Sequence, residues 1–400
     1  MHVLMISDVY FPRVNGVSTS IRSFRRELQT QGHRVTLLVP HYPHCGQYDQ
    51  ANPDPDLIRI PSRSIPRDPE DRFMVKREIM RLVPELQKQC FDVLHIQTPF
   101  VAHYAGLVLA RALKLSVVES YHTFFEEYLY HYIPFLPRNL LRWVARRFTV
   151  AQCNAVQYVI APSRAMHDAL RGYGVESPIT ILPTGLEASQ FRQGDGARFR
   201  HEHGIDPRRP VALYIGRVAH EKNIDFLLQA FQRCYQQLPE ALLLIVGEGP
   251  AVEHLRQLAQ QLGIAPATRF IGYLDRDTTL LDCYSAGDVF IFASRTETQG
   301  LVLLESMAQG TPVLSTAHMG TRDILEKSQG ALIVEEDAEV FSASLAGLLI
   351  NSLNRQLLSK HARDDARKWS AREMTERLLQ LYTKLMSPKH TQGALVANSN

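Results

Sequence analysis

The chain of 400 residues has few cysteines, no long apolar run and little net charge. Its five cysteines are scattered without a CxxC pair, which favours a reduced, cytoplasmic setting over a disulfide-rich secreted one. No run of about 18 uninterrupted apolar residues occurs, so we expect no membrane-spanning helix. The short apolar N-terminus is typical of a buried first strand and not of a secretory leader. A formal net charge of +3 argues against general nucleic-acid binding.

The length and the hydrophobic fraction of 45% predict more than one globular domain. Apolar runs typical of strands alternate with helical patterns, which indicates parallel α/β sheets. The alternation pauses in a polar stretch at 191–209 and then restarts. We therefore predict an α/β protein of two doubly wound, Rossmann-like domains facing across a cleft, with ligands at the carboxyl ends of the strands. The expected segments are domains 1–190 and 191–369, a helix at 370–386 and a disordered polar tail at 387–400.

Two carboxylates flank a glycine in the segment 296–305, which reads Thr-Glu-Thr-Gln-Gly-Leu-Val-Leu-Leu-Glu. A helix that begins at about Gly300 places Glu297 in the preceding loop and Glu305 roughly 7–8 Å further along the helix axis. This separation is comparable to the reach from a nucleotide's diphosphate to its ribose. The helix N-terminus offers N–H groups and positive potential to a diphosphate. We expect Glu305 to bind ribose hydroxyls and Glu297 sugar hydroxyls, although such a pair taken alone is more often solvated surface.

Three other loops at predicted strand ends carry glycine or basic residues. Gly216 precedes Arg217 and Lys222, which could clamp a diphosphate, the arginine through its fork and the lysine as a point charge. Gly247 lies in the turn Val-Gly-Glu-Gly-Pro, and Gly16 lies where the first predicted helix begins. A glycine at these points lets a phosphate or a sugar approach the backbone. Taken alone, Gly16 fits an ordinary turn equally well, and the other two motifs are more often a solvated loop or an ordinary turn.

Taken together, these motifs resemble the retaining family 4 glycosyltransferases of GT-B fold. The resemblance rests on Gly216-Arg217 with Lys222, the turn 246–250, the segment 270–273, Glu297 with Glu305, and Asn15-Gly16-Val17, in this order. It covers about residues 1–386. It implies that the C-terminal domain holds a nucleotide sugar and the N-terminal domain an acceptor. It also implies that the last helix, 370–386, packs back on the N-terminal domain.

The resemblance also implies roles for single residues. Arg217 and Lys222 would neutralise the diphosphate leaving group in place of a metal ion, and His122 matches the family's histidine near the reaction centre. The implied catalytic residues are Glu297, His122, Arg217 and Lys222, and the implied donor-binding residues are Gly16, Arg217, Lys222, Gly247, Glu297, Gly300, Leu301 and Glu305. A lone histidine is more often structural. Many relatives carry two adjacent glycines where this chain has Asn15-Gly16, which puts backbone contact there in doubt.

No metal or other cofactor is expected beside the nucleotide sugar. The triplet Asp-x-Asp, which binds Mn²⁺ in the other large glycosyltransferase fold, occurs twice in the chain. Asp54-Pro55-Asp56 lies in a proline-rich loop with no strand before it. Asp275-Arg276-Asp277 follows an apolar run, but Asp277 is placed to cap the next helix.

The acceptor is predicted from a less specific pattern. The segment 121–135 is unusually aromatic for a loop, and the basic, amphipathic segment 138–148 follows it. The candidate acceptor or membrane contacts are Tyr128, His131, Arg142, Trp143 and Arg146. Basic and aromatic residues together suit an anionic bilayer surface, and a domain helix with a solvated basic edge fits equally well. The stretch His-Thr-x-x-Glu-x-Tyr-x-x-Tyr is most similar to the diacylglycerol glucosyltransferase branch.

The resulting prediction is a retaining hexosyltransferase, peripheral on the cytoplasmic membrane face, that moves glucose from UDP-glucose to a lipid hydroxyl such as that of diacylglycerol. GDP-mannose as the donor, or a soluble or lipid-linked glycan as the acceptor, stays open. Sugar-nucleotide 2-epimerases share the fold but lack the Glu297/Glu305 set. A catalytically silent nucleotide-sugar-binding partner is the non-enzymatic alternative, disfavoured because the four implied site residues of the C-terminal domain are present. No motif encodes the base, the hexose, the linkage or the oligomeric state.

Overall fold

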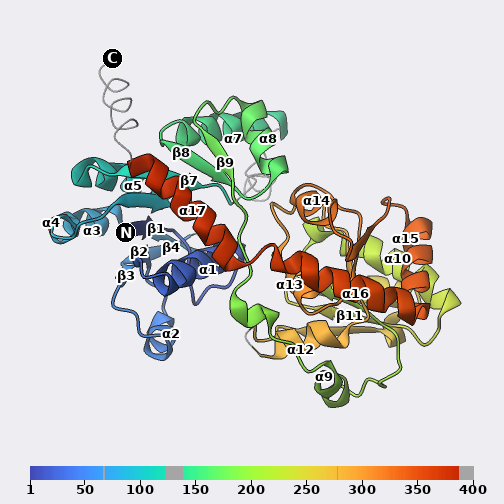
Figure 1. Cartoon of the computed structure of the whole chain (residues 1–400). Coiled ribbons are helices and arrows are strands. Elements are labelled where there is room, and N and C mark those ends of the chain that lie inside the picture. The colour runs from blue at the N-terminus through green and yellow to red at the C-terminus, as the bar shows by residue number, and fades with distance from the viewer. Residues whose placement is uncertain (66–67, 123–137, 277, 387–400) are drawn as a thin grey trace. The chain divides into compact units, whose positions relative to one another are not determined.

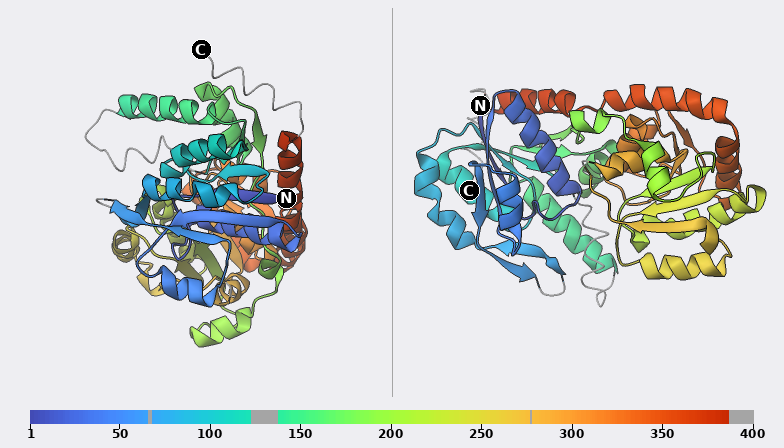
Figure 2. Two further views of the ribbon diagram at one scale, coloured as in Figure 1. Left: turned by 90° about the vertical axis from the view of Figure 1, so that its left-hand side faces the viewer. Right: turned by 90° about the horizontal axis from the view of Figure 1, so that it is seen from below.

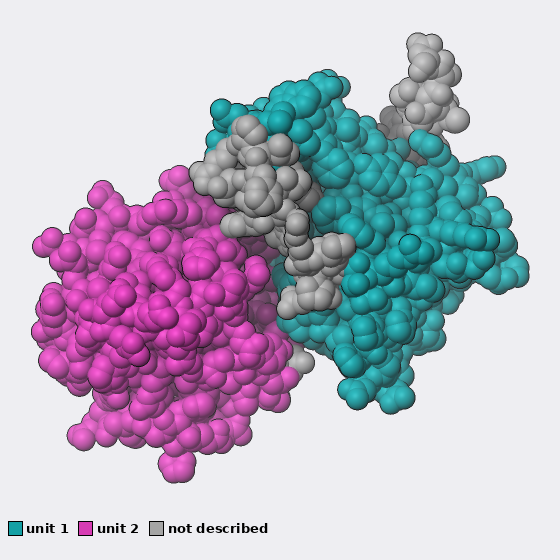
Figure 3. Space-filling view, turned by 180° about the vertical axis from the view of Figure 1, so that it is seen from behind, with its two compact units in different colours: residues 1–185, 371–400 teal, residues 186–370 magenta. Residues whose placement is uncertain are grey.

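The computed structural model describes residues 1–65, 68–122, 138–276 and 278–386. Two compact units make up the chain (Figure 3). Unit 1 comprises Met1–Gly185 and the C-terminal segment from Ala371, and unit 2 comprises Leu186–Ser370. Each unit is built on one large parallel sheet with helices packed against it (Figure 1). The prediction of two doubly wound α/β domains is confirmed.

Unit 1 has a seven-stranded sheet in the order β3-β2-β1-β6-β7-β8-β9, in which neighbouring strands are parallel. Its strands are β1 His2–Ile6, β2 Arg34–Pro40, β3 Leu57–Ile60, β6 Val93–Ile96, β7 Ser116–Ser120, β8 Tyr158–Ala161 and β9 Ile179–Ile181, and an antiparallel pair is formed by β4 Ser62–Ile65 and β5 Asp68–Met74. Its helices are α1 Gly16–Thr30, α2 Cys45–Ala51, α3 Lys76–Arg81, α4 Val83–Gln87, α5 Val101–Leu113, α7 Arg138–Cys153, α8 Arg164–Tyr173 and α17 Ala371–Met386. The central strands are apolar runs because both of their faces are buried.

The C-terminal helix α17 belongs to unit 1 although it follows unit 2 in the sequence. It packs beside α1 (Figure 2), and its residues Leu378, Leu381 and Tyr382 join the buried core formed with the central strands. The Tyr382 hydroxyl lies 2.6 Å from Nδ1 of His95, on β6. The chain therefore completes the core of its first unit with its last helix.

Unit 2 has a six-stranded parallel sheet in the order β12-β11-β10-β13-β14-β15. Its strands are β10 Val211–Ile215, β11 Leu242–Val246, β12 Thr268–Gly272, β13 Val289–Phe292, β14 Val313–Ser315 and β15 Ala331–Ile333. Its helices are α9 Gly196–Glu202, α10 Ile224–Gln237, α11 Val252–Gln261, α12 Thr279–Ala286, α13 Leu301–Ala308, α14 Gly320–Leu325, α15 Ala338–Ile350 and α16 Ser352–Arg367, with short 3₁₀ turns η1 Ala188–Phe191, η2 His220–Lys222 and η3 Ala265–Ala267.

The strand order reverses beside β1 in unit 1 and beside β10 in unit 2. In open parallel sheets, ligands bind outside the carboxyl ends of the strands at such switch points. The loops that follow β10 and β13 are therefore the first place to look for a site in unit 2. Within the described part of the chain, no helix is both long enough and apolar enough to cross a membrane.

Candidate donor site in unit 2

The predicted pair Lys222 and Glu297 is in direct contact at the switch point of unit 2. Lys222 ends the 3₁₀ turn that follows β10, and Glu297 lies in the loop between β13 and α13. Nζ of Lys222 donates to Oε1 of Glu297 at 2.7 Å, and each side chain is less than one-fifth exposed. A partly buried ion pair of this kind fixes both side chains and leaves polar atoms available to a sugar or a phosphate.

The helix α13 begins at Leu301, immediately after Gly300. Gly300 has a φ of 92°, in the left-handed region, and a Cβ at this position would lie 3.0 Å from Cγ2 of Thr321. A glycine is therefore required here to start the helix directly after the Glu297 loop. In the first turn, the N–H of Leu303 donates to the Gly300 carbonyl at 3.1 Å. The start of a helix favours anions through its N–H groups and its dipole, and a diphosphate at this helix start stays a prediction.

Glu305 lies inside α13 with a side chain only 2% exposed. The Tyr284 hydroxyl donates to its Oε2 at 2.8 Å, Nε2 of Gln190 donates to its Oε1 at 3.1 Å, and Arg276 forms an ion pair with it. Burial raises the pKa of Tyr284, so the hydroxyl stays protonated and remains a donor. The carboxylate is thus oriented by three protein groups, and ribose hydroxyls would share it with them.

Arg217 is not brought to the Lys222–Glu297 pair. Its side chain is 63% exposed, and Nη1 lies 3.5 Å from Oε1 of Glu221, four residues later in the chain. Its backbone is better fixed, because the buried Tyr214 hydroxyl donates to the Arg217 carbonyl at 3.2 Å. An exposed pair of this length contributes little to stability, so the guanidinium can exchange Glu221 for another anion at small cost.

Gly247 has a packing role that is independent of any ligand. It has a φ of 124°, and a Cβ here would lie 2.0 Å from the carbonyl oxygen of Gly216. Its N–H donates to the Gly272 carbonyl at 2.8 Å. The loops that follow β10, β11 and β12 thus touch through their backbones, which explains the glycine-rich turn without a phosphate. Contact of Gly247 with a donor stays a prediction.

His122 and Gly16 lie in unit 1, His122 shortly after a strand and Gly16 at the start of a helix. His122 follows β7, and its Nε2 lies 3.1 Å from Oε1 of Gln97. It lines a small pocket with Ser120 and Thr184. Burial lowers the pKa of His122 to about 4, so the imidazole is neutral at neutral pH and can act there as a hydrogen-bonding group but not as a cation.

Asn15, where relatives often have a second glycine, caps α1. Its Oδ1 accepts from the Ser18 N–H at 2.8 Å, and its own N–H donates to Oγ of Ser18 at 2.9 Å. This reciprocal arrangement is a capping box. Gly16 follows it at the exposed first position of the helix, and a Cβ there would meet nothing within 4 Å. Packing does not require a glycine at this position, so the predicted close approach of a ligand stays open.

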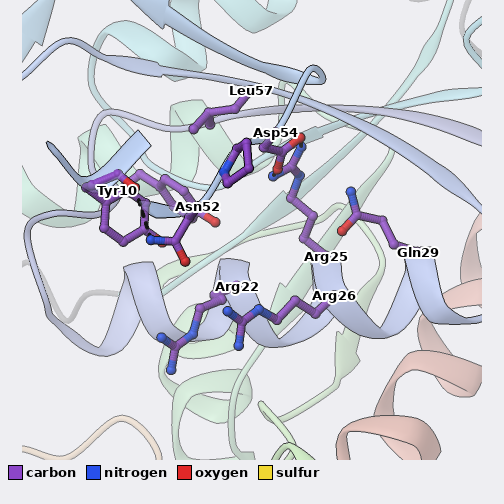
Figure 4. Close-up of a pocket in the computed structure, with 10 residues that line it drawn as sticks. Tyr10, Arg22, Arg25, Arg26, Gln29, Asn52, Asp54 and Leu57 are labelled. Atoms are coloured by element: carbon purple, nitrogen blue, oxygen red, sulfur yellow. Dashed lines mark hydrogen bonds and ion pairs between the residues drawn. The ribbon is translucent and has the colours of Figure 1, made fainter. Parts of the chain in front are cut away.

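The pocket shown in Figure 4 lies elsewhere in unit 1, between α1 and the segment that leads from α2 to β3. It has a volume of about 220 Å³, and Arg22, Arg25 and Arg26 of α1 line it together with Tyr10. None of the residues predicted to bind donor or acceptor lines it. Arg25 is held in place by Asp54 and by the Val35 carbonyl.

Neither Asp-x-Asp triplet forms a carboxylate cluster in the described residues. Asp54 pairs with Arg25, and Asp56 pairs with Arg34 at 2.7 Å. Asp275 accepts from the Thr278 hydroxyl at 2.7 Å, whereas Asp277, the predicted helix cap, lies outside the described residues. No group of three or more His, Cys, Asp or Glu side chains in the described ranges is placed to hold a metal ion.

The candidate membrane contacts fall on α7 and on the segment before it. Trp143 is 58% exposed, with Leu140 and Val144 exposed on the same side of the helix, while Leu141 and Ala145 are buried. Arg142 and Arg146 are exposed as well, and the Arg146 guanidinium lies 5.0 Å from the ring centre of Tyr173 on α8. The two other candidate contacts, Tyr128 and His131, lie outside the described residues.

Sequence reasoning missed the residues that hold Glu305 in place. Tyr284 lies on α12, and Gln190 lies in the connection between the two sheets. No local pattern marks either of them, because their role depends on the packing of α12 and η1 against α13.

Two family descriptions match the chain. Residues 14–190 match "Glycosyltransferase Family 4", and residues 195–365 match "Glycosyl transferases group 1". The alpha-monoglucosyldiacylglycerol synthase of Streptococcus pneumoniae is 33% identical over 363 residues, which span 88% of this chain and 78% of that protein. A GDP-mannose-dependent alpha-mannosyltransferase of Corynebacterium glutamicum is 24% identical, over 84% of this chain and 77% of that protein.

The fold is shared with a solved structure of low sequence identity. Anabaena Alr3699/HepE, crystallised with UDP and glucose, superposes with a TM-score of 0.77 at 15% identity, over 96% of this chain and all of that chain. Together with the sequence matches, this likeness confirms the predicted family and the predicted GT-B fold.

Proposed function

We propose that this protein transfers glucose from UDP-glucose to the free hydroxyl of diacylglycerol, with retention of configuration. The chain belongs to the glycosyltransferases that join a family 4 domain to a group 1 domain. The observation that carries this proposal is the 33% identity to an alpha-monoglucosyldiacylglycerol synthase over most of both chains. The neighbouring fold crystallised with UDP and glucose supports a uridine donor.

In unit 2, the donor would lie with its diphosphate against the start of α13. Lys222 and the backbone N–H groups of that helix would stabilise the negative charge that grows on the departing diphosphate. Arg217, released from Glu221, would add a second cation. Glu297, held by Lys222, would accept from sugar hydroxyls, and Glu305 from ribose hydroxyls. The acceptor oxygen would approach the anomeric carbon from the side of the leaving group, which retains its configuration.

A lipid acceptor requires the enzyme to reach a bilayer. The exposed side of α7 offers Trp143, Leu140 and Val144 beside Arg142. Apolar side chains that enter the interface next to arginines that meet anionic headgroups are the usual composition of a peripheral membrane helix. We propose that this face docks on the anionic cytoplasmic surface of the membrane.

The test is glycolipid formation by the purified protein. It is offered UDP-glucose, UDP-galactose or GDP-mannose with liposomes of anionic phospholipid that contain diacylglycerol, and with liposomes that lack it. We expect a glucolipid from UDP-glucose only when diacylglycerol is present, and none from the Glu297→Ala variant. UDP release without a glycolipid would refute the acceptor. A mannolipid from GDP-mannose would refute the donor and would favour the activity that the Corynebacterium relative's name describes.

Membrane docking is tested separately by liposome flotation. We expect Trp143→Ala to lower binding to anionic liposomes, while Leu353→Ala, which removes an even more exposed apolar side chain from α16, leaves it unchanged. Equal binding of both variants would refute docking through α7 without bearing on the donor.

A further inference from the structure

A single carboxylate joins the loops that follow four neighbouring strands of unit 2. Glu336 follows β15, and its side chain is 17% exposed. Its Oε1 accepts from Nδ2 of Asn223 at 3.1 Å, and its Oε2 accepts from Nε of Arg295 at 2.9 Å. Nε2 of His318 lies 2.9 Å from the same Oε2, and Nη2 of Arg295 also contacts Oε1. The hydrogen bonds from Arg295 are the main cause that lowers the pKa of Glu336, so it is ionised at neutral pH.

Two of these partners adjoin the Lys222–Glu297 pair in the sequence. Asn223 directly follows Lys222 and starts α10 in a left-handed conformation, with a φ of 57°. Its Nδ2 also donates to the carbonyl of Ala293, at the end of β13, at 3.2 Å. Arg295 stands two residues before Glu297. The carboxylate therefore holds Asn223, directly after the lysine, and Arg295, two residues before the glutamate, at a fixed separation.

The third partner acts on the backbone of Glu297. His318 lies two residues before Gly320, at the start of α14, and the N–H of Gly320 donates to the Glu297 carbonyl at 3.0 Å. Glu336 thus anchors the loop after β14, which in turn holds Glu297. Four loops therefore meet at the Glu336 carboxylate. Lys222 and Glu297 themselves are joined directly by one hydrogen bond of 2.7 Å, so their separation also depends on the loops that carry them.

We propose that Glu336 is a positioning residue that sets the geometry of the Lys222–Glu297 pair by joining the loops after β10, β13 and β14. The inference rests on the proposed donor site, because the consequence for transfer follows only if that pair meets the donor. Glu336 itself acts through Asn223, Arg295 and His318. A displacement of reacting groups by about 1 Å costs roughly 100-fold in rate, so partial loosening of these loops should cost about tenfold.

The same contacts contribute little to folding. Arg295 is 62% exposed and His318 is 40% exposed, and exposed ion pairs contribute little to stability. If Glu336 did not position the site, its substitution would therefore change neither activity nor the free energy of unfolding by much, whereas a positioning role lowers kcat in a protein of unchanged stability. This difference makes the two roles separable by experiment.

The experiment compares Glu336→Gln with Glu335→Gln. The amide that replaces the Glu336 carboxylate keeps the size of the side chain but cannot accept hydrogen bonds from all three partners. Glu335 is an exposed neighbour, so Glu335→Gln removes the same charge without these contacts. UDP release from UDP-glucose in the presence of diacylglycerol liposomes gives kcat and KM, and calorimetric titration with UDP gives its Kd. For Glu336→Gln we expect kcat about tenfold lower and the Kd of UDP within about threefold of the original, and for Glu335→Gln no change.

The second measurement tests whether the effects of substituting Glu336 and Arg295 are coupled. Arg295→Gln removes the main partner of Glu336 from the exposed side, so it keeps the inference testable even if Glu336→Gln folds poorly. We expect it to lower kcat in the same direction, and the double variant to be no worse than the more affected single variant, because both changes release the same loop. Additive losses would overturn the proposal.

Failure of the inference and failure of the donor site give different results. A kcat for Glu336→Gln within twofold of that for Glu335→Gln, while Lys222→Met and Glu297→Ala strongly lower UDP release, overturns the positioning role alone. Full activity of Lys222→Met and Glu297→Ala overturns the donor site and with it the inference. A selective loss of UDP affinity in Glu336→Gln at unchanged kcat also overturns it, because that result indicates direct contact with the nucleotide.

Discussion

Unit 1 should lose stability steeply between pH 7 and pH 5, because two histidines in it are held neutral by burial. Burial lowers the pKa of His122 to about 4 and that of His95 to about 3, the latter with a smaller contribution from His122. His95 is enclosed between the Tyr382 hydroxyl, at 2.6 Å, and Oγ of Ser120, at 2.8 Å. In the unfolded chain, both histidines return to a pKa of about 6.5.

The size of the effect follows from the protons that only the unfolded state binds. Above about pH 6.5 neither state is protonated, and the stabilising effect of a depressed histidine pKa is fully present. As the pH falls to 5, each unfolded histidine takes up almost a whole proton and each folded one stays neutral. The loss is about 2 kcal/mol for each histidine, about 4 kcal/mol for the two. Burial also lowers the pKa of His2 and His33, which adds to the loss.

Amide hydrogen exchange read by mass spectrometry measures this loss for each unit separately. The free energy of opening is taken from peptides of β1 and β6 in unit 1 and of β10 and β11 in unit 2, after correction for the pH dependence of the intrinsic exchange rate. We expect unit 1 to lose at least about 4 kcal/mol between pH 7 and pH 5 and unit 2 to change far less.

The variant His122→Gln supplies the control, because it removes one of the two titrating groups. Its unit 1 should lose about 2 kcal/mol less than the original chain over the same range. An equal loss in the variant would show that His122 is protonated in the folded state, and the argument that it is a neutral hydrogen-bonding group would fall.

Three further predictions concern local structure and charge. Gly247→Ala should destabilise unit 2 by about 3 kcal/mol or more in denaturant unfolding, because the added Cβ would lie 2.0 Å from the Gly216 carbonyl oxygen. The control Gly347→Ala, in open space on α15, should stabilise unit 2 by about 0.5–1 kcal/mol. Similar effects of the two substitutions would contradict the close packing of Gly247. Asn15→Ala should cost unit 1 about 1 kcal/mol in the same assay through loss of the capping box, and no cost would show that the cap is not formed. Lys222→Met should lower kcat about 100-fold, measured as UDP release from UDP-glucose, and a loss below threefold would exclude it from stabilising the leaving group.

The regular parts of the fold were predictable because their signals are local. The helix α17 coincides with an amphipathic run in the sequence, and its observed bounds lie within one residue of the predicted 370–386. The antiparallel pair β4 and β5 was not predicted. Its segment is rich in charge and proline and shows no alternation of apolar and polar residues, so it lacks the usual sequence signal of a strand. The helices α2, α3 and α4 are too short to display a period.

In the candidate site, too, the features set by local spacing were predictable and the contacts between distant residues were not. The spacing of Glu297 and Glu305 predicts their placement on either side of a helix start, because the rise of a helix is fixed. The contact between Lys222 and Glu297 could not follow from spacing, since they are 75 residues apart. It follows from the sheet order, which places β13 beside β10, and only the family resemblance joined them beforehand.

The residues that hold the Lys222–Glu297 pair in place could not be predicted from the sequence. Parallel strands present their loops at one edge of the sheet, so the side chains that touch a ligand gather within a few residues of strand ends and can be sought there. A supporting side chain needs only to reach that edge, and it can come from any later loop. Glu336 stands at a strand end as well, yet the acidic run Glu335-Glu336-Asp337 reads as solvated surface until Asn223, Arg295 and His318 are seen around one member of it. The sequence thus indicates where the chemistry is, and the packing shows what keeps it in place.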